Sequence, residues 1–220
     1  VKEKDDIGAL IRLFDGQRWF YASTTDLASV DTELAGLAKL GRADARINEH
    51  PAVKKMQVNT GDHCRFAQTS VSKVQLSEKI ALTESFADLV KNDGQISHWS
   101  ASYSDAHITK QFYSSLGANL KFDTQTAGLR LGFRFGSGAN VFSETWCKAM
   151  SEFKPLAGLH HEARKLIEKA REFFTSAEKI QGGNYTVVLS PMAAGIFAHE
   201  SFGHKSEADF MIGDEGMKKE

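Results

Sequence analysis

The residues with the clearest chemical potential stand at positions 199–204, in the order His-Glu-Ser-Phe-Gly-His. Histidine is the commonest protein ligand of metal ions such as zinc. A glutamate beside a ligand is well placed to take a proton from an attacking water molecule. The two histidines are five positions apart, one more than in the familiar His-Glu-x-x-His pattern of zinc peptidases. The pattern favours metal-assisted chemistry, provided that the backbone can bring both rings to one ion.

The spacing of the two histidines makes a demand on the backbone. At positions i and i+5 of a regular helix, the second side chain points roughly 140° away from the first. Both rings could reach one ion if the helix widens into a π-bulge, or if it ends between them at Gly203, since glycine permits unusual dihedral angles. The competing interpretation is a surface helix that carries two histidines by chance.

Two local elements are expected to hold this motif. Residues 184–190 form a short run rich in β-branched residues, which predicts a buried strand. Ser190 and Pro191 then suit an N-cap and a first helical position, and an apolar helix is expected to follow. The motif would lie in the third turn of this largely buried helix, where a charged pair is costly without partners or a metal.

The first hundred residues predict a hairpin and two helices. Strands at 7–14 and 18–23 flank Asp15-Gly16, a strong turn signal. An amphipathic helix is expected to cover residues 27–38, with Thr24 or Thr25 as its cap. The polar stretch 41–61 reads mostly as loop, and a second amphipathic helix is expected from position 77 or 78 to position 90.

From residue 96 to residue 135 the hydrophobic residues alternate with a period of two, which replaces the helical period of the preceding segment. Segments 96–104, 107–114, 118–123 and 127–135 predict a four-stranded antiparallel meander, with a turn at 136–138. A third helix is expected at 155–176. His160 and His161 open it and are interpreted as part of a solvated face, because adjacent helical side chains diverge and chelate poorly. These blocks predict an α+β fold, with amphipathic helices packed on an antiparallel sheet.

Composition limits the classes of partner. The chain has 220 residues, 41% of them hydrophobic, and a net charge of −1, so no bulk attraction to nucleic acid or anionic lipid is implied. No apolar run approaches the roughly 18 residues of a membrane span. The only two cysteines, Cys64 and Cys147, suit free thiols in a reducing compartment, and cytoplasm is the expected location. Cys64, next to His63, is the better candidate for an additional zinc ligand.

Residues 188–209 resemble the signature of the TldD/PmbA family, a group of zinc metallopeptidases also named as modulators of DNA gyrase. The likeness continues at residues 11–27, which look like the early hairpin and helix of the family, and at residues 101–105, in its central meander. The resemblance implies that His199 and His204 are zinc ligands and that Glu200 is the general base. It also points to the TldD-type active subunit, because the related inactive subunits lack the motif.

The resemblance carries further expectations. Chain 1–220 would be an N-terminal α+β domain truncated at both ends, and the third zinc ligand would be a cysteine in a β-rich C-terminal domain. Apart from the resemblance, Glu207 and Asp209 lie close enough along the chain to accept hydrogen bonds from the histidine N–H groups, or for one of them to be the third ligand; the alternative is that both are solvated carboxylates after the helix. The expected partners are unfolded or small peptides, and a dimer mate that is either a copy or a related subunit.

Two other functional classes remain open at this point. One is a non-catalytic lobe that binds peptides or dimerises, with the histidines in structural roles. The other is a DNA-associated regulator, which would need a basic surface that the charge balance does not supply. Zinc stoichiometry separates the first from an enzyme, and salt-dependent DNA binding tests the second.

Overall fold

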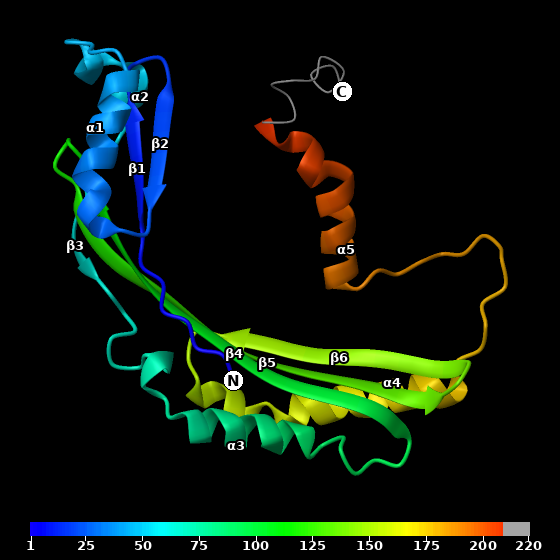
Figure 1. The fold of residues 1–220 in the computed structure, drawn as a ribbon. Helices are drawn as coiled ribbons and strands as arrows, with labels where there is room; N and C mark the ends of the chain where they lie inside the picture. Colours follow the sequence, from blue (N-terminus) through cyan, green and yellow to red (C-terminus); the bar gives the residue numbers. More distant parts are fainter. Residues whose placement is uncertain (209–220) are drawn as a thin grey trace. The chain divides into compact units, whose positions relative to one another are not determined.

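A computed structural model of the protein describes residues 1–208 (Figure 1). The chain divides into two compact units, the first covering Val1–Phe174 and the second starting at Thr175. None of the described helices is both long enough and apolar enough to cross a membrane.

The first unit starts with the expected hairpin. Strand β1 (Ala9–Phe14) pairs in antiparallel register with β2 (Trp19–Thr24). The Asp15 carboxylate accepts hydrogen bonds from the backbone N–H groups of Gln17 and Arg18, at 2.9 and 2.8 Å. Gly16 has a φ of 94°, which only glycine adopts readily, so the turn signal in the sequence is confirmed.

A short 3-10 turn, η1 (Leu27–Ser29), and helix α1 (Val30–Leu40) follow the hairpin and confirm the first helix. The predicted caps are wrong. Asp26 caps the turn through a 3.0 Å bond from the N–H of Ala28, while the Thr24 hydroxyl lies 2.9 Å from that of Ser29. Asp26 displaces the threonines because its carboxylate, two residues before Ala28, reaches that N–H directly.

The region predicted to be mostly loop contains three short elements, η2 (Ile47–Glu49), α2 (Pro51–Lys54) and strand β3 (Thr60–His63). A further short turn, η3 (Val71–Lys73), precedes helix α3 (Leu76–Ala87). Helix α3 confirms the second predicted helix, although it ends three residues earlier than expected.

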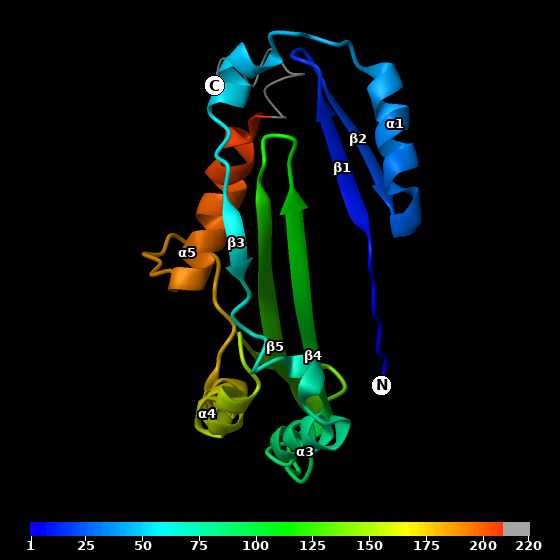
Figure 2. The same ribbon diagram turned by 90° about the vertical axis from the view of Figure 1, so that its left-hand side faces the viewer.

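The central sheet corrects the predicted meander. Two long strands, β4 (Ile96–Tyr113) and β5 (Asn119–Ser137), replace the four short ones, and the sequence patterns missed a third strand, β6 (Asn140–Met150). Strands β4 and β6 both run antiparallel to β5. Strand β3 pairs in parallel with the first residues of β5 (Figure 2). The predicted breaks near positions 105 and 125 do not occur, because the polar residues there find hydrogen-bond partners within the fold.

Those partners form a polar latch, made of the buried side chains of Asp123, Ser70 and Gln125 and the half-buried His107. Asp123 accepts bonds from the backbone N–H groups of Arg65 and Phe66, at 2.7 and 3.0 Å, and lies 3.0 Å from Nε2 of His107. Nδ1 of His107 lies 2.9 Å from the Ser70 hydroxyl. Gln125 accepts from Val71 N–H at 2.8 Å and donates to two carbonyls. The latch ties residues 65–71 to the middle of the sheet.

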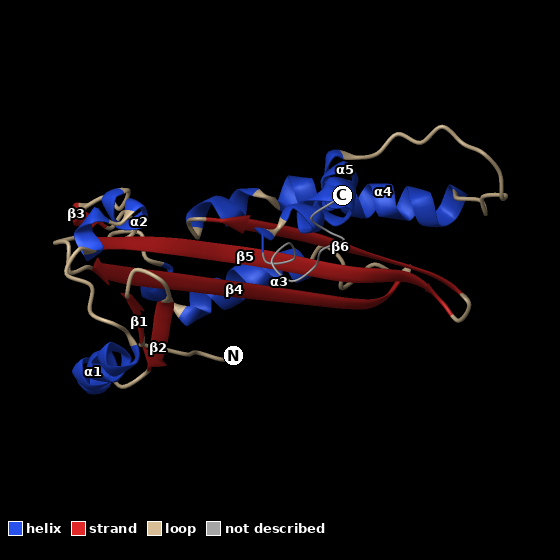
Figure 3. Ribbon diagram, turned by 90° about the horizontal axis from the view of Figure 1, so that it is seen from above, coloured by secondary structure: helices blue, strands red, loops and turns tan. Residues whose placement is uncertain are grey.

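Helices α3 and α4 (His160–Ser176) cover one face of the sheet, and η4 (Lys154–Gly158) leads into α4 (Figure 3). Alternate residues of β5 point into the core beneath, and the helices contribute Phe86, Ala163 and Ile167. The residues of β5 in this core are Ala127, Leu129, Leu131, Phe133 and Phe135. The predicted α+β class is confirmed.

The prediction that both histidines of α4 are solvated is wrong for His160. Its ring stacks on Phe86 with centroids 4.0 Å apart, and its Nε2 lies 2.9 Å from the Ser85 hydroxyl. His161 is exposed, as expected. The first position of α4 faces the neighbouring helix α3, so its imidazole is used in packing.

The second unit also departs from the sequence-based prediction. Residues 184–190 form no strand, and Val187 and Val188 are 70% and 93% exposed. A strand needs a hydrogen-bonded neighbour, and no described strand pairs with this segment. Helix α5 (Pro191–Ala198) forms where predicted, but its residues are exposed and not largely buried.

Candidate metal centre

The helix that leads to the motif is started by its sequence. The Ser190 hydroxyl accepts a hydrogen bond from the N–H of Ala193 at 3.2 Å, and Pro191 occupies the first turn, where its missing N–H costs nothing. Both predictions for this boundary are confirmed. Helix α5 then continues into a wider turn, η5 (His199–Gly203), and a final 3-10 turn, η6 (His204–Ser206).

The wider turn is a π-helix, which is the first of the two devices that the histidine spacing required. The N–H of His204 bonds to the carbonyl of His199, five residues earlier. This widening places the two rings with centroids 4.4 Å apart and planes at 69°. Gly203 keeps right-handed helical angles, φ −57° and ψ −53°, so the alternative of a helix that ends at the glycine does not occur.

Three potential ligand groups come together on this turn. One ligand atom from each of His199, Glu200 and His204 lies within 4.8 Å of the others, and Nε2 of His204 is 3.8 Å from a carboxylate oxygen of Glu200. Two nitrogens bound to one tetrahedral zinc lie roughly 3.4 Å apart, given a Zn–N distance of about 2.1 Å. The ligand atoms, which lie up to 4.8 Å apart, would have to approach one another to share one ion. Two imidazoles and a carboxylate are also a donor set that zinc accepts, so these residues fit the metal.

Glu207 controls the orientation of one of these rings. Its Oε1 lies 2.7 Å from Nδ1 of His204. A carboxylate can only accept, so Nδ1 carries the proton and Nε2 keeps its lone pair for a metal. This is the contact that the sequence suggested for Glu207, and its role in metal binding stays a prediction. Asp209, the other candidate, lies outside the described residues.

The cysteines do not join this group. Within residues 1–208, the side chains of His199, Glu200 and His204 are the one set of three or more possible ligands this close together. Neither Cys64 nor Cys147 forms a disulfide in the described structure. Desolvation by burial, and the nearby carboxylates of Asp62 and Asp123, raise the pKa of the Cys64 thiol and so disfavour the thiolate that binds metal.

The motif side chains are exposed in this structure. His204 keeps 46% of its side-chain surface accessible, and Glu200 keeps 66%. Within the described part of the second unit, no hydrophobic side chains cover the motif. Phe202, which belongs to the motif, is itself 73% exposed. The structure thus assembles the ligand geometry locally, from the π-turn and Glu207 alone.

Two known proteins similar to this chain have names that imply a bound metal. The chain is 29% identical, over 142 residues, to a metalloprotease of Synechocystis; the match covers 63% of the chain and 30% of that protein. It is 25% identical, over 219 residues, to a metalloprotease of Methanothermobacter thermautotrophicus, covering 96% of the chain and 46% of the relative. Both of these similar proteins are named metalloproteases. The chain spans less than half the length of these relatives, and no protein-family model matches it.

A solved structure shares the fold. The similarity to a Bacteroides thetaiotaomicron protein, named for a proposed role as a modulator of DNA gyrase, has a TM-score of 0.58 at 19% identity. It covers 88% of this chain and 45% of that protein. At this level of identity the likeness concerns the arrangement of helices and strands.

Proposed function

We propose that this chain carries the zinc-binding helix of a metal-dependent peptidase of the TldD type. The observation that supports the proposal best is the π-turn, which brings the ligand atoms of His199, Glu200 and His204 within 4.8 Å of one another. Chance histidines on a regular surface helix, five positions apart, would diverge. The metalloprotease relatives support the same class of chemistry.

Each residue of the motif has a distinct part in the proposal. His199 and His204 hold the zinc ion, and Glu207 fixes the His204 ring through Nδ1. Bound zinc supplies Lewis-acid polarisation of a peptide carbonyl and lowers the pKa of water. Glu200 accepts a proton from the attacking water and returns it to the leaving amine.

Several features of the whole enzyme belong to the proposal as well. A peptidase zinc site usually has three protein ligands. The third would come from outside residues 1–208, and the family resemblance implies a cysteine in a β-rich domain; Asp209 is the other candidate. The same resemblance implies unfolded or small peptides as substrates, a dimer with a copy or a related subunit, and a cytoplasmic location.

Zinc content tests the metal site. We expect the 220-residue chain to bind one zinc ion in titration calorimetry, and His199→Ala or His204→Ala to abolish that binding. His161→Ala is the matched control, since His161 is an exposed helical histidine outside the motif. If the parent chain and the three variants bound zinc equally well, the motif histidines would not be zinc ligands.

Activity tests the base separately. In the full-length protein, Glu200→Gln is expected to keep its zinc and to lose peptidase activity by about a hundredfold or more, the usual contribution of a general base. Retained activity with zinc still bound would exclude Glu200 from its role without affecting the ligand assignment.

A second function is favoured by one observation, the exposure of all three motif side chains. Catalytic zinc sites lie in dry, shaped cavities. A non-catalytic lobe that binds peptides or dimerises would need no such cavity. It predicts that the 220-residue chain binds peptides equally well before and after His199→Ala, and that no zinc stoichiometry is reached.

A further inference from the structure

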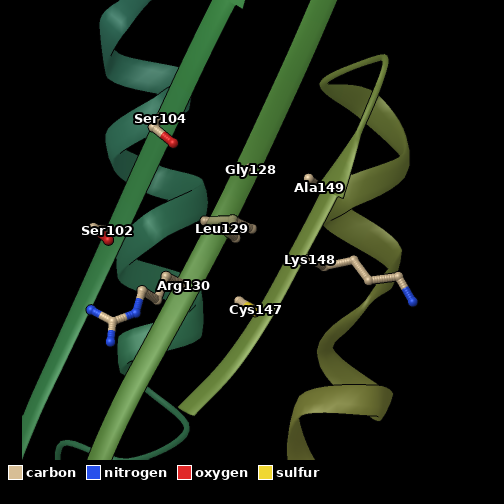
Figure 4. A pocket seen from close by; sticks show the side chains of 8 residues that line it. All are labelled: Ser102, Ser104, Gly128, Leu129, Arg130, Cys147, Lys148 and Ala149. Atoms are coloured by element: carbon tan, nitrogen blue, oxygen red, sulfur yellow. The ribbon is translucent and has the colours of Figure 1, made fainter. Parts of the chain in front are cut away.

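The face of the central sheet opposite α3 and α4 carries two arginines in an unusual setting. Outward-facing positions of β5 alternate between glycine and arginine, as Gly128, Arg130, Gly132 and Arg134. The side chains beside Arg130 on the flanking strands are small, those of Ser102 and Cys147 (Figure 4). The guanidinium group of Arg130 therefore stands above a low surface.

Neither arginine is neutralised on this face. Arg130 is exposed and has no hydrogen-bond or ion-pair partner among the described residues. Arg134 donates only its Nε, at 3.2 Å, to the Ser143 hydroxyl, which leaves its terminal amino groups for another acceptor. The outward cross-strand neighbours from row 128 to row 134 of the described strands include no Asp or Glu. They are His98, Ser100, Ser102, Ser104, Ser143, Thr145, Cys147 and Ala149. Two positive groups without counter-charges complement a ligand with two carboxylates.

The glycines leave room for that ligand. Gly128 has no positive φ, and a Cβ there would meet the Lys148 carbonyl oxygen at an ordinary 3.5 Å, so the fold does not demand glycine. Glycine inside a strand weakens it, and it often marks a place where a ligand or a second backbone approaches closely. A groove of about 290 Å³ runs over Gly128, between Ser104 and Ala149, and reaches Arg130.

We propose that this face binds a separate acidic peptide in extended conformation, with two carboxylates four residues apart. Arg130 and Arg134 are four residues apart on one strand, so their Cα atoms lie about 13 Å apart at a rise of 3.3 Å per residue. An extended peptide has the same rise, and its side chains at n and n+4 share one face. Each guanidinium can bind one carboxylate through two parallel hydrogen bonds. The proposal adds a binding site to the chain and does not depend on the zinc motif.

Fluorescence anisotropy with labelled peptides tests this site on the 220-residue chain. A Ser/Thr-rich peptide with Glu at n and n+4 is expected to bind, and its Gln counterpart to bind at least tenfold more weakly. A peptide with Glu at n and n+3 presents its carboxylates on opposite faces, so it should bind about tenfold more weakly than the first. Equal affinity for the three peptides would overturn the proposal.

Protein variants test the residues. Arg130→Gln and Arg134→Gln should each weaken binding about tenfold, whereas Arg164→Gln, an exposed arginine on α4, should leave it unchanged. Gly128→Val fills the groove beside Arg130 and should weaken binding about tenfold without lowering the melting temperature, because valine suits a strand. An equal loss in Arg164→Gln would mean non-specific charge attraction and would overturn the site.

Two further measurements separate this site from the zinc proposal and from self-association. His199→Ala should bind the acidic peptide as the parent chain does, so a failure of the zinc site would leave this result intact. Sedimentation of the chain alone is expected to be the same with and without Arg130→Gln. Self-association that Arg130→Gln disrupts would instead assign the face to a second copy and refute the peptide.

Discussion

At the scale of the residue, the orientation of one imidazole decides which of its nitrogens can bind a metal. Nδ1 of His204 is occupied by Glu207 at 2.7 Å, so only Nε2 remains for the ion. The same ring lies with its Nε2 3.8 Å from Glu200. Glu207 therefore favours the tautomer in which the unprotonated Nε2 lies on the side of the Glu200 carboxylate.

Replacement of Glu207 should weaken metal binding without breaking the turn. Glu207→Gln keeps the size of the side chain but removes the carboxylate that orients His204. We expect zinc affinity to fall about 10- to 100-fold, the usual effect of losing such a partner. Competition with a zinc chelator measures the change. Glu168→Gln, on the exposed side of α4, should bind zinc as the parent does, and an equal loss there would contradict the assignment.

At the scale of the element, the length of the central strands depends on the polar latch. Asp123 and Gln125 stand inside β5, where a bare carboxylate or amide would be costly. Backbone N–H groups of Arg65, Phe66 and Val71 satisfy them. The strand can therefore continue through positions that would otherwise end it.

Because of the polar latch, the stability of the fold should decrease at acidic pH. Burial by itself would raise the pKa of Asp123, but hydrogen bonds from Arg65 N–H, His107 and Phe66 N–H hold it below its ordinary value of 3.8. The ionised carboxylate is thus favoured in the folded state. Its stabilisation is complete above that value and is lost as the pH falls below it.

Thermal unfolding between pH 6 and pH 3 tests this expectation. Asp123→Asn should melt at a lower temperature than the parent chain at pH 6, and the difference should shrink at pH 3. Asp5→Asn, at an exposed position near the N-terminus, should follow the parent at both values. A constant difference across this pH range would mean that the charge of Asp123 is irrelevant.

At the scale of the whole molecule, the first unit has its own core. Phe86 is 1% exposed and stacks on Trp146, with centroids 5.1 Å apart, and on His160. It thus joins α3, β6 and α4. A core that connects three elements in this way should unfold cooperatively.

Removal of the Phe86 ring should destabilise the first unit. Phe86→Ala is expected to lower the free energy of unfolding by about 3–5 kcal/mol, the range for a buried phenylalanine that leaves a cavity. Urea titration measures the loss. Phe202→Ala, in the second unit and 73% exposed, should change the stability of the first unit little. Similar losses in the two variants would contradict the assignment of the core.

The connection between the units should be cut first by a protease. Residues 177–190 form no helix or strand, and Ile180 is 79% exposed. Trypsin is expected to cleave after Lys179, and the resulting 1–179 fragment should keep the melting transition of the first unit. Mass spectrometry identifies the site, and Lys179→Gln should delay the cut. Early cleavage within β4 or β5 would contradict this description.

Much of the local structure could be predicted because its causes are local. Asp15-Gly16 makes its own turn, and Ser190-Pro191 starts its own helix. The five-residue spacing of His199 and His204 called for either a π-turn or a helix that ends at Gly203, and the structure has the π-turn. Each of these features depends on residues within one or two turns of the backbone, which the sequence displays directly.

The tertiary structure alone decided the remainder, because its causes are distant along the chain. Asp123 stays inside a strand because backbone N–H groups 57 and 58 residues earlier bond to its carboxylate. His160 is packed because it contacts Ser85, which lies 75 residues before it. Sequence patterns cannot show contacts between residues so far apart. Residues 184–190 have the composition of a strand but no described strand beside them. The hydrophobic period of a segment shows which of its side chains could be buried. Whether they are buried depends on which other element packs against the segment, and this is decided by the tertiary structure.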